Sequence, residues 1–270
     1  MPDRLLNRTS FFNTPESLPI SDIKIIAESI PKSILVVAPH PDDETLGCGG
    51  AIALLRQLNL NVSVSIVSDG TQSHPNSIAY PAPVLKQLRE GESLRALSIL
   101  GVAPEAVTFW GMPDGAVPSA STEVIMRGLE DGEINIKRKK DRNVIASITG
   151  YLLDLTPSII FLPWRKDPHP DHRASWQLFT TACERLNYCP RIIEYPIWDW
   201  DKQQRQDFPD SVKAWRLDIS QVIELKRQAI AQYRSQISDT IDDDPDGFRL
   251  TSEMISNFTR PWEIYLEVKS

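Results

Sequence analysis

The chain has 270 residues, 41% of them hydrophobic and 24% charged, with a net charge of −7 and three cysteines. This balance is typical of a globular protein with a full hydrophobic core, and the odd cysteine count argues against a disulfide framework. The acidic charge disfavours nucleic-acid binding, and no stretch approaches the roughly 18 apolar residues of a membrane span. The N-terminus lacks the apolar core of a signal peptide, so we expect a cytoplasmic protein.

Strands and helices are predicted to alternate along most of the chain. Short apolar, β-branched runs predict strands at residues 33–38, 61–67, 107–110, 158–162, 191–195 and 215–218. Helical spacing of apolar residues predicts helices at residues 47–58, 84–100, 143–155, 171–186 and 220–235. We expect the fourth helix to be capped by an acidic residue and the fifth by Ser220.

This alternation predicts an α/β fold with a doubly wound, mostly parallel sheet and Rossmann-like topology. We expect residues 33–270 to form a single domain. Residues 1–32 are expected to form an arm that lies across the domain or is partly disordered. In such sheets ligands bind outside the carboxyl ends of the strands, so chemical residues should directly follow strands.

Three of the four histidines lie in two matching His-Pro-Asp tripeptides. The first, at residues 40–42, directly follows the strand predicted at residues 33–38 and is followed by Asp43. The second, at residues 169–171, comes a few residues after the strand predicted at residues 158–162 and is followed by His172. One copy alone is explained by a turn, because Pro and Asp are ordinary turn formers. Two copies, both at the expected edge of the sheet, indicate a functional site.

The residue types in these motifs suit a metal. Zinc binds imidazole nitrogen and carboxylate oxygen, and a catalytic zinc site has three protein ligands and a water. Zinc lowers the pKa of that water to about 7 and polarises a carbonyl. One His and one Asp from the first turn and a His from the second complete a ligand set. A remaining carboxylate can act as general base and a remaining His can stabilise an oxyanion, so the motifs predict a metal-dependent hydrolase.

The two motifs resemble those of the LmbE-like, or PIG-L-like, N-deacetylases. A-P-H-P-D-D-E at residues 38–44 is similar to the family signature A-H-P-D-D-E, with Pro39 between the usual Ala and His. H-P-D-H at residues 169–172 is similar to the second family motif, and the resemblance is weaker beyond His172. It implies an LmbE-like fold and a zinc-dependent hydrolase that removes an N-acetyl group from an N-acetylglucosamine-like sugar or glycoconjugate.

The resemblance also implies roles for the residues that match the motifs. The implied zinc ligands are His40, Asp43 and His172. Asp42 would be the general base, and His169 would stabilise the oxyanion and assist protonation. Asp171 would orient a histidine from outside the metal shell. Fe2+ can fill the same ligands. Glu44 is assigned either to a helix N-terminus or to a supporting role.

Five further residues are candidates for contacts with the sugar. Arg89 resembles a family arginine that faces the sugar hydroxyls, although an exposed helix salt bridge explains it equally well. The other four are in predicted loops after strands: Asp69, His74, Asp114 and Arg165. Asp114 lies in a Pro-Asp-Gly sequence, which a simple turn also explains.

Other interpretations remain open. Two His and one carboxylate also form the site of non-haem iron oxygenases, but those leave Asp42 and His169 without a role. The glycine-rich run at residues 47–50 suggests a nucleotide-binding or regulatory module, but it lacks G-x-G-x-x-G spacing, and close packing explains it better. A deacetylase fold can also act on a different N-acyl amide. Tryptophans near Trp198 leave a homo-oligomer open.

Overall fold

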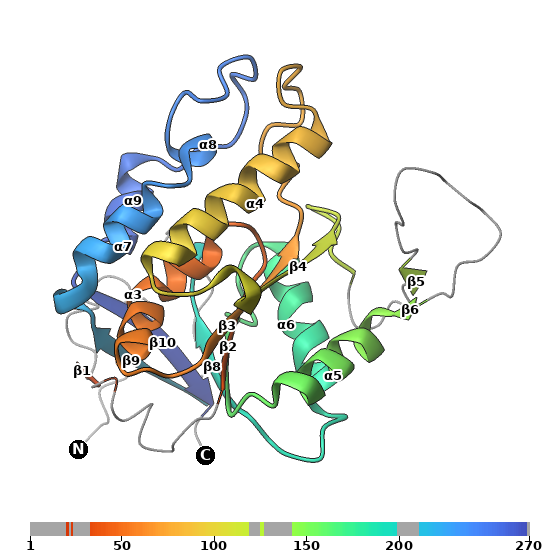
Figure 1. Cartoon of the computed structure of the whole chain (residues 1–270), viewed down its shortest axis with the longest axis vertical. Coiled ribbons are helices and arrows are strands. Elements are labelled where there is room, and N and C mark those ends of the chain that lie inside the picture. The colour runs from red at the N-terminus through yellow and green to blue at the C-terminus, as the bar shows by residue number, and fades with distance from the viewer. Residues whose placement is uncertain are drawn as a thin grey trace, which may run out of the picture.

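A computed structural model describes residues 20–21, 23, 33–118, 125–126, 142–198 and 211–268 (Figure 1). Most of the predicted arm at residues 1–32 lies outside these described residues, so the division into an arm and one domain stays a prediction. Within the described ranges no helix has the length and apolar character that a membrane crossing requires.

One sheet of eight strands organises the described chain, in the order β1-β9-β10-β8-β7-β2-β3-β4. Its strands are β1 (Ile20–Ser21), β2 (Ile34–Ala38), β3 (Val62–Ser68), β4 (Val107–Met112), β7 (Ile159–Pro163), β8 (Arg191–Tyr195), β9 (Val212–Asp218) and β10 (Trp262–Val268). β10 is antiparallel to β8 and β9, and the other pairs in this sheet are parallel. A separate antiparallel pair joins β5 (Ile125–Met126) and β6 (Arg142–Asn143).

The strands from β4 to β8 have the order expected of a Rossmann-like fold. Numbered in chain order from β2, they lie side by side as 3-2-1-4-5. The chain order reverses between β2 and β7, and this point is where doubly wound sheets bind ligands. The prediction of a doubly wound, mostly parallel sheet with Rossmann-like topology is confirmed.

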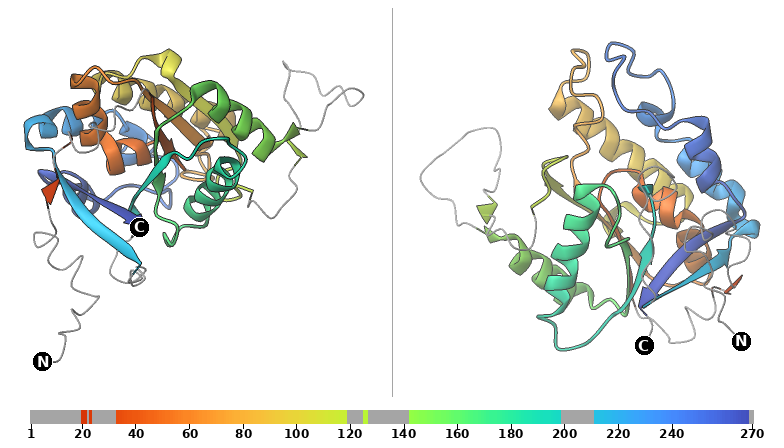
Figure 2. Two further views of the ribbon diagram at one scale, coloured as in Figure 1. Left: turned by 90° about the horizontal axis from the view of Figure 1, so that it is seen from below. Right: turned by 180° about the vertical axis from the view of Figure 1, so that it is seen from behind.

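Helices cover both faces of the sheet (Figures 1 and 2). One face carries α3 (Asp43–Gln57), α4 (Ala82–Ile99) and α7 (Ile223–Ile230), and the other carries α5 (Val144–Leu155) and α6 (Pro170–Cys183). The remaining elements are α8 (Arg234–Ile237), α9 (Ser252–Phe258), and the 3-10 turns η2 (Pro104–Ala106) and η4 (Ser220–Val222).

The central strand β2 is apolar throughout because both of its faces are buried. Ile34, Val36 and Ala38 point into the core under α3 and α4. Leu35 and Val37 point into the core under α5 and α6. Side chains alternate between the two faces of a strand, so a strand covered on both sides appears in the sequence as a continuous apolar run.

The glycines at the start of α3 permit close packing. A Cβ added to Gly47 would lie 2.2 Å from Cδ2 of Tyr195, and one added to Gly50 would lie 2.5 Å from Cγ2 of Ile219. Both distances are too short for a side chain to fit. The close-packing explanation of the run at residues 47–50 is therefore confirmed.

Two predicted helix caps are wrong. α6 is capped by His169, whose Nδ1 accepts a hydrogen bond from the backbone N of Asp171, and not by an acidic side chain. Ser220 starts a 3-10 turn, and α7 begins only at Ile223. The side chain that bonds there belongs to Asp218, which accepts from the backbone N of Ser220 at 2.9 Å. Ser220 is a residue type that often caps helices, but in this turn the carboxylate of Asp218 accepts the hydrogen bond instead.

Several element boundaries also differ from the sequence prediction, and two elements near the end of the chain were not predicted. α3 begins at Asp43, so the end of the first motif forms its first turn. β4 continues to Met112, beyond the predicted end at residue 110. No element was predicted for residues 252–268, where the structure has α9 and β10.

Candidate metal centre and active site

The two His-Pro-Asp motifs meet at the point where the strand order reverses. His40 follows β2, Asp43 is the first residue of α3, and His172 lies in the first turn of α6. Nδ1 of His40 lies 3.2 Å from Oδ2 of Asp43. Nε2 of His172 lies 3.2 Å from the same oxygen and 3.3 Å from Nδ1 of His40. Three potential ligand atoms from two distant segments thus form a nearly equilateral triangle.

The size of this triangle fits a tetrahedral metal ion. Ligand atoms about 2.0–2.1 Å from a zinc ion at tetrahedral angles lie roughly 3.3–3.4 Å from one another. Two imidazole nitrogens and one carboxylate oxygen, with no thiolate, suit Zn2+ or Fe2+. Two other groups of potential ligands share His40, one with His169 and His172 and one with Asp114 and Asp171, each within 4.8 Å.

Carboxylates hold the outer nitrogens of both histidines. Nε2 of His40 lies 3.2 Å from Oδ2 of Asp171 and 3.2 Å from Oδ1 of Asp114. Nδ1 of His172 lies 3.3 Å from Oδ2 of Asp167. Such partners fix the tautomer and orientation of a metal-binding imidazole, leaving the other nitrogen free to coordinate. The pattern supports coordination through Nδ1 of His40 and Nε2 of His172.

Asp167 is a site residue that sequence reasoning missed. It is fully buried and accepts backbone hydrogen bonds from His169 at 2.9 Å, Trp198 at 3.1 Å and Ile197 at 3.4 Å. These bonds join the loop after β7 to the segment after β8. The available signal was a carboxylate two residues before the second motif, at the same edge of the sheet.

The carboxylates around His40 and His172 favour the protonated forms of these two histidines. Burial alone would lower the pKa of His172, but the carboxylates of Asp167 and Asp43 raise it to about 9. Burial also opposes protonation of His40, yet contacts with Asp114, Asp171 and Asp43 raise its pKa. The pKa of Asp43 is lowered despite burial, because both histidines favour its charged form. A divalent cation bound here would displace these protons.

Asp42 lies beside this triangle in a strained conformation. Its φ is 135°, which residues other than glycine rarely adopt, and its side chain is buried. Its backbone N donates to Oε2 of Glu44 at 3.1 Å, and Nη2 of Arg89 lies 3.2 Å from Oδ2. Burial raises the pKa of Asp42, and the charge of Arg89 opposes that rise. The strain and the contacts hold a basic carboxylate in one place.

The ring of His169 lies against the candidate ligands His40 and His172, where it can act as a neutral hydrogen-bond donor. Its ring is edge-on to His40 at 4.7 Å and stacks on Trp198 at 6.3 Å. Burial and the nearby charges of His40 and His172 lower its pKa. Its Nδ1 accepts from the backbone N of Asp171, so the proton of the neutral ring is on Nε2. Trp198 is partly covered by this contact, and the expected homo-oligomer stays a prediction.

Of the five predicted sugar contacts, Asp114 contacts the His40 ring and Arg89 forms an ion pair with Asp42. Oδ2 of Asp114 also accepts from the backbone N of Gln72 at 2.8 Å. Arg89 is 3% exposed and donates to the carbonyls of Pro41 at 2.7 Å and Gly70 at 2.8 Å. Its guanidinium is bonded within the chain, and the exposed salt bridge considered from the sequence is wrong.

The other three candidates are bonded in the surrounding loops. Oδ1 of Asp69 accepts from the backbone N and the Oγ1 of Thr71, at 3.2 and 2.9 Å. Arg165 pairs with the buried Glu194 at 2.7 Å. His74 is 1% exposed, with Nδ1 3.3 Å from Oγ of Ser73. Their contacts with substrate stay predictions.

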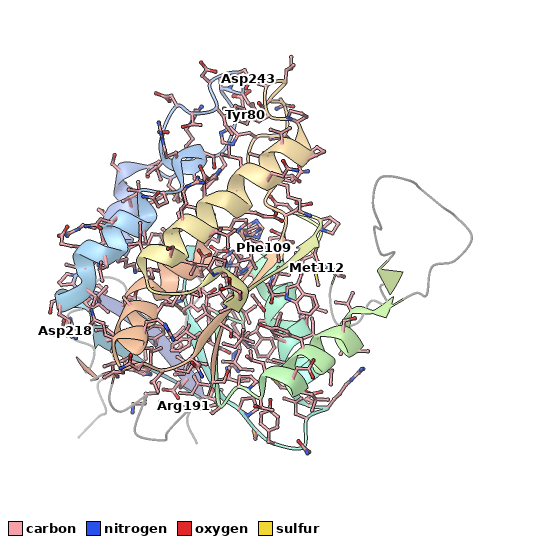
Figure 3. The ribbon with its side chains drawn as sticks, viewed as in Figure 1. Tyr80, Phe109, Met112, Arg191, Asp218 and Asp243 are labelled. Carbon is pink, nitrogen blue, oxygen red and sulfur yellow. The ribbon has the colours of Figure 1, made fainter. Side chains whose placement is uncertain are left out.

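Two loops at this edge of the sheet are bonded to each other. Asp243 accepts from the backbone N of Ile78 and of Ala79, each at 2.8 Å, and Figure 3 shows it close to Tyr80. A Cβ added to Gly247 would lie 2.1 Å from Cδ2 of His74. The loop after β3, which carries His74, is thus held by the loop before α9.

Comparisons with known proteins identify the family of this chain. A family model described as PIG-L, GlcNAc-PI de-N-acetylase, matches residues 35–183. A probable N-acetyl-alpha-D-glucosaminyl L-malate deacetylase 2 of Bacillus subtilis is 27% identical over 210 residues, covering 75% of this chain and 82% of that protein. The N,N'-diacetylchitobiose deacetylase of Pyrococcus horikoshii, solved with an inhibitor, has a TM-score of 0.59 at 22% identity, covering 88% and 84% of the two chains.

The same fold also carries a different chemistry. A 4-carboxy-2-hydroxymuconate hydratase from Pseudomonas putida KT2440 has a TM-score of 0.55 at 22% identity, covering 76% of this chain and 80% of that one. Shared architecture therefore does not identify a reaction, which has to come from the site itself.

Proposed function

We propose that this chain, which belongs to the PIG-L family of GlcNAc-PI de-N-acetylases, is a metal-dependent hydrolase that removes the acetyl group from an N-acetylglucosamine-like sugar or glycoconjugate. The observation that carries the proposal is the triangle of His40, Asp43 and His172, with Asp42 next to Asp43 in the chain and the ring of His169 against that of His40. Relatives named as deacetylases of glucosaminyl malate, of an inositol glucosaminide and of diacetylchitobiose support the substrate class.

The three ligands would hold Zn2+, with Fe2+ as the alternative that the same atoms accept. Bound there, the ion supplies Lewis acidity that polarises the acetyl carbonyl and makes water a nucleophile near neutral pH. The remaining steps belong to side chains.

Asp42 is proposed as the general base. Its carboxylate accepts a proton from the attacking water, and its raised pKa makes it a stronger base than an exposed aspartate. The same proton is then available to the amine nitrogen, which must be protonated to leave. The charge of Arg89 opposes the effect of burial by favouring the ionised form of Asp42, and its contact at 3.2 Å holds the carboxylate in position.

His169 is proposed to stabilise the oxyanion. As the acetyl carbon becomes tetrahedral, negative charge grows on its oxygen, and Nε2–H of His169 can donate to it. The products are acetate and the free amine. Asp171 and Asp167 take no part in bond making, but they orient His40 and His172.

The test is metal content together with acetate release from a panel of N-acetylglucosamine derivatives and simple N-acyl amides. We expect bound metal and acetate release in the wild type, and loss of both in His172→Ala. Asp42→Asn should keep the metal and lose about 100- to 10,000-fold in turnover, as expected for removal of a general base. The exposed Asp154→Asn on α5 is the matched control.

Each contrary result has a distinct meaning. Near wild-type turnover in Asp42→Asn would refute the base assignment. Metal binding with hydrolysis only of other N-acyl amides would keep the hydrolase and replace the sugar. A wild type that neither binds added zinc nor releases acetate would refute the proposal. A cytoplasmic location and a homo-oligomeric state stay predictions from the sequence.

A further inference from the structure

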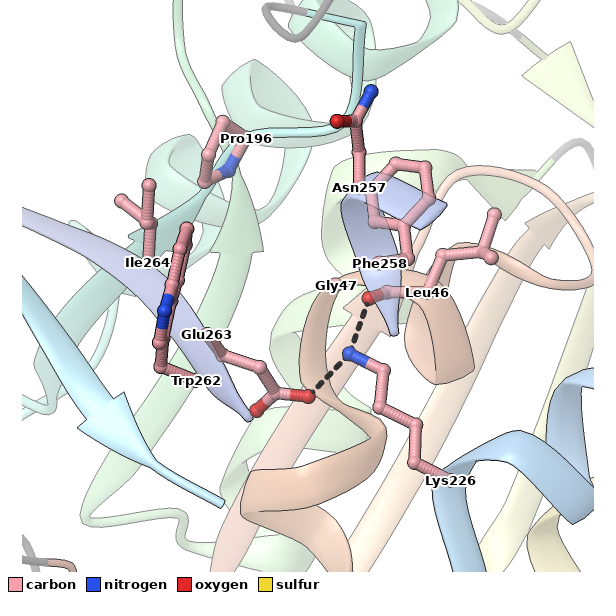
Figure 4. Close-up of a pocket in the computed structure, with 9 residues that line it drawn as sticks. All are labelled: Leu46, Gly47, Pro196, Lys226, Asn257, Phe258, Trp262, Glu263 and Ile264. Atoms are coloured by element: carbon pink, nitrogen blue, oxygen red, sulfur yellow. Dashed lines mark hydrogen bonds and ion pairs between the residues drawn. The ribbon is translucent and has the colours of Figure 1, made fainter. Parts of the chain in front are cut away.

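A buried ion pair lies against the middle of α3, the helix that begins with Asp43. Nζ of Lys226, from α7, lies 2.6 Å from Oε1 of Glu263, from β10 (Figure 4). The side chains are 1% and 3% exposed. The pair lines a small pocket together with Leu46 and Gly47 of α3 (Figure 4).

Both charges bind backbone groups of α3. The carboxylate of Glu263 accepts from the backbone N of Gly50 at 2.7 Å and of Ala51 at 2.9 Å. Nζ of Lys226 donates to the backbone O of Leu46 at 2.8 Å. In an unperturbed helix the amide of Gly50 would donate to that same carbonyl of Leu46, because helical bonds join residues four apart. A single amide hydrogen cannot serve two acceptors at full strength, so the ion pair competes with the helical hydrogen bond at this point.

The charges match the helix halves on either side. An anion is favoured at the amide end of a helical segment and a cation at its carbonyl end. Glu263 lies at the amides that begin the second half of α3, and Lys226 lies at the carbonyl that ends the first turn. Side chains inserted into a helical hydrogen-bond ladder are a recognised cause of kinks.

The side chain of Lys226 packs closely on α3. A Cβ added to Gly49 would lie 3.2 Å from Cγ of Lys226, so the lysine stem passes directly over the helix. Buried ion pairs often stabilise a fold no better than apolar residues of similar volume. Stability alone is therefore a poor explanation for a charged pair at this position, and its geometry points to orientation.

We propose that Lys226 and Glu263 are positioning residues of the metal centre. Together they set the angle of the first turn of α3, so that Oδ2 of Asp43 lies 3.2 Å from both imidazole nitrogens of the triangle. The proposal rests on the proposed function, because it assigns the pair to the metal site of that deacetylase.

The test compares Lys226→Met with Arg191→Met. Arg191 pairs with Glu267 of the same strand β10 at 2.8 Å, and its partner lies away from α3. In the metal-free protein, Lys226→Met should speed hydrogen exchange of residues 43–51 about tenfold, since helix amides exchange through local opening. Its dissociation constant for Co2+ should rise about 10- to 100-fold, the usual cost of losing a supporting partner, with kcat lowered and KM little changed. Arg191→Met should stay within about twofold of wild type in each measurement.

Glu263→Gln provides a second route if Lys226→Met does not fold. It keeps the shape of the side chain and one carbonyl oxygen, so it can serve one of the two amides, and we expect a smaller loss of Co2+ affinity. The proposal is overturned if the folded variant loses thermal stability but matches Arg191→Met in Co2+ affinity and in exchange. A wild type that binds no Co2+ would instead refute the proposed function, while exchange in α3 would still decide whether the pair holds the helix.

Discussion

Replacing Asp167 by asparagine should weaken metal binding about 10- to 100-fold, because the carboxylate holds the outer nitrogen of His172. Oδ2 of Asp167 lies 3.3 Å from Nδ1 of His172 and is completely buried. Asparagine has the same shape but no charge, so it favours the Nδ1–H tautomer less and leaves the ring less firmly oriented. Any loss of turnover that results from weaker metal binding should largely disappear when the variant is measured at saturating metal concentration.

The same substitution should also lower stability. Oδ1 of Asp167 accepts from the backbone N of His169, and Oδ2 accepts from that of Trp198. An asparagine NH2 group must face one of these donors in either rotamer, and an unsatisfied buried amide costs about 1–3 kcal/mol. For a domain of this size that corresponds to a fall in Tm of roughly 2–4 °C per kcal/mol.

Co2+ titration and thermal unfolding of the metal-free protein measure the two effects separately. Asp154→Asn, the same change at an exposed position of α5, is the control and should alter neither. A variant that loses Tm but keeps the wild-type dissociation constant would show that Asp167 serves only the backbone. The reasoning about His172 would then be refuted.

Three other perturbations test the packing, the role of Arg89 and the protons of the site. Gly47→Ala should destabilise the protein by about 1–3 kcal/mol in thermal unfolding, because its methyl group has no space. Gly150→Ala should stabilise it by roughly 0.5–1 kcal/mol, because nothing lies within 4 Å of the added Cβ. A change of stability in the same direction for both variants would contradict the packing argument. Arg89→Lys should lower kcat with little change in KM, since the guanidinium positions Asp42, and steady-state kinetics showing a higher KM at constant kcat would support the sugar contact instead. Metal affinity, measured by Co2+ titration, should rise between about pH 6 and pH 8, because His172 has a pKa of about 9 and must release its proton to bind the metal. An affinity that does not depend on pH would argue against His172 as a ligand.

Local patterns were sufficient for much of the fold. β2 was recognisable because both of its faces are buried, which makes all five of its residues apolar. The Rossmann-like order of strands followed from the alternation of strands with helices. The glycine run at residues 47–50 was correctly assigned to packing, although its partners Tyr195 and Ile219 could not be named.

Patterns were misleading where tertiary contacts decide the local structure. β10 alternates in polarity, but its place between β8 and β9 depends on pairing with distant strands, as Leu266 opposite Glu194 illustrates. The cap of α6 is the imidazole of His169, whose ring also packs against that of His40 from a distant segment.

The sequence by itself determined the fold class, the edge of the sheet that carries the site and the residues of the two motifs. These depend on side-chain type and on spacing along the chain, which the sequence states directly. The tertiary structure alone decided which carboxylate holds which histidine, that Arg89 is bonded to Asp42, and that Lys226 and Glu263 act on α3. Arg89 and Asp42 are 47 residues apart, and Glu263 and Gly50 are 213 apart. Contacts over such separations depend on how the whole sheet packs its helices, which no local spacing records.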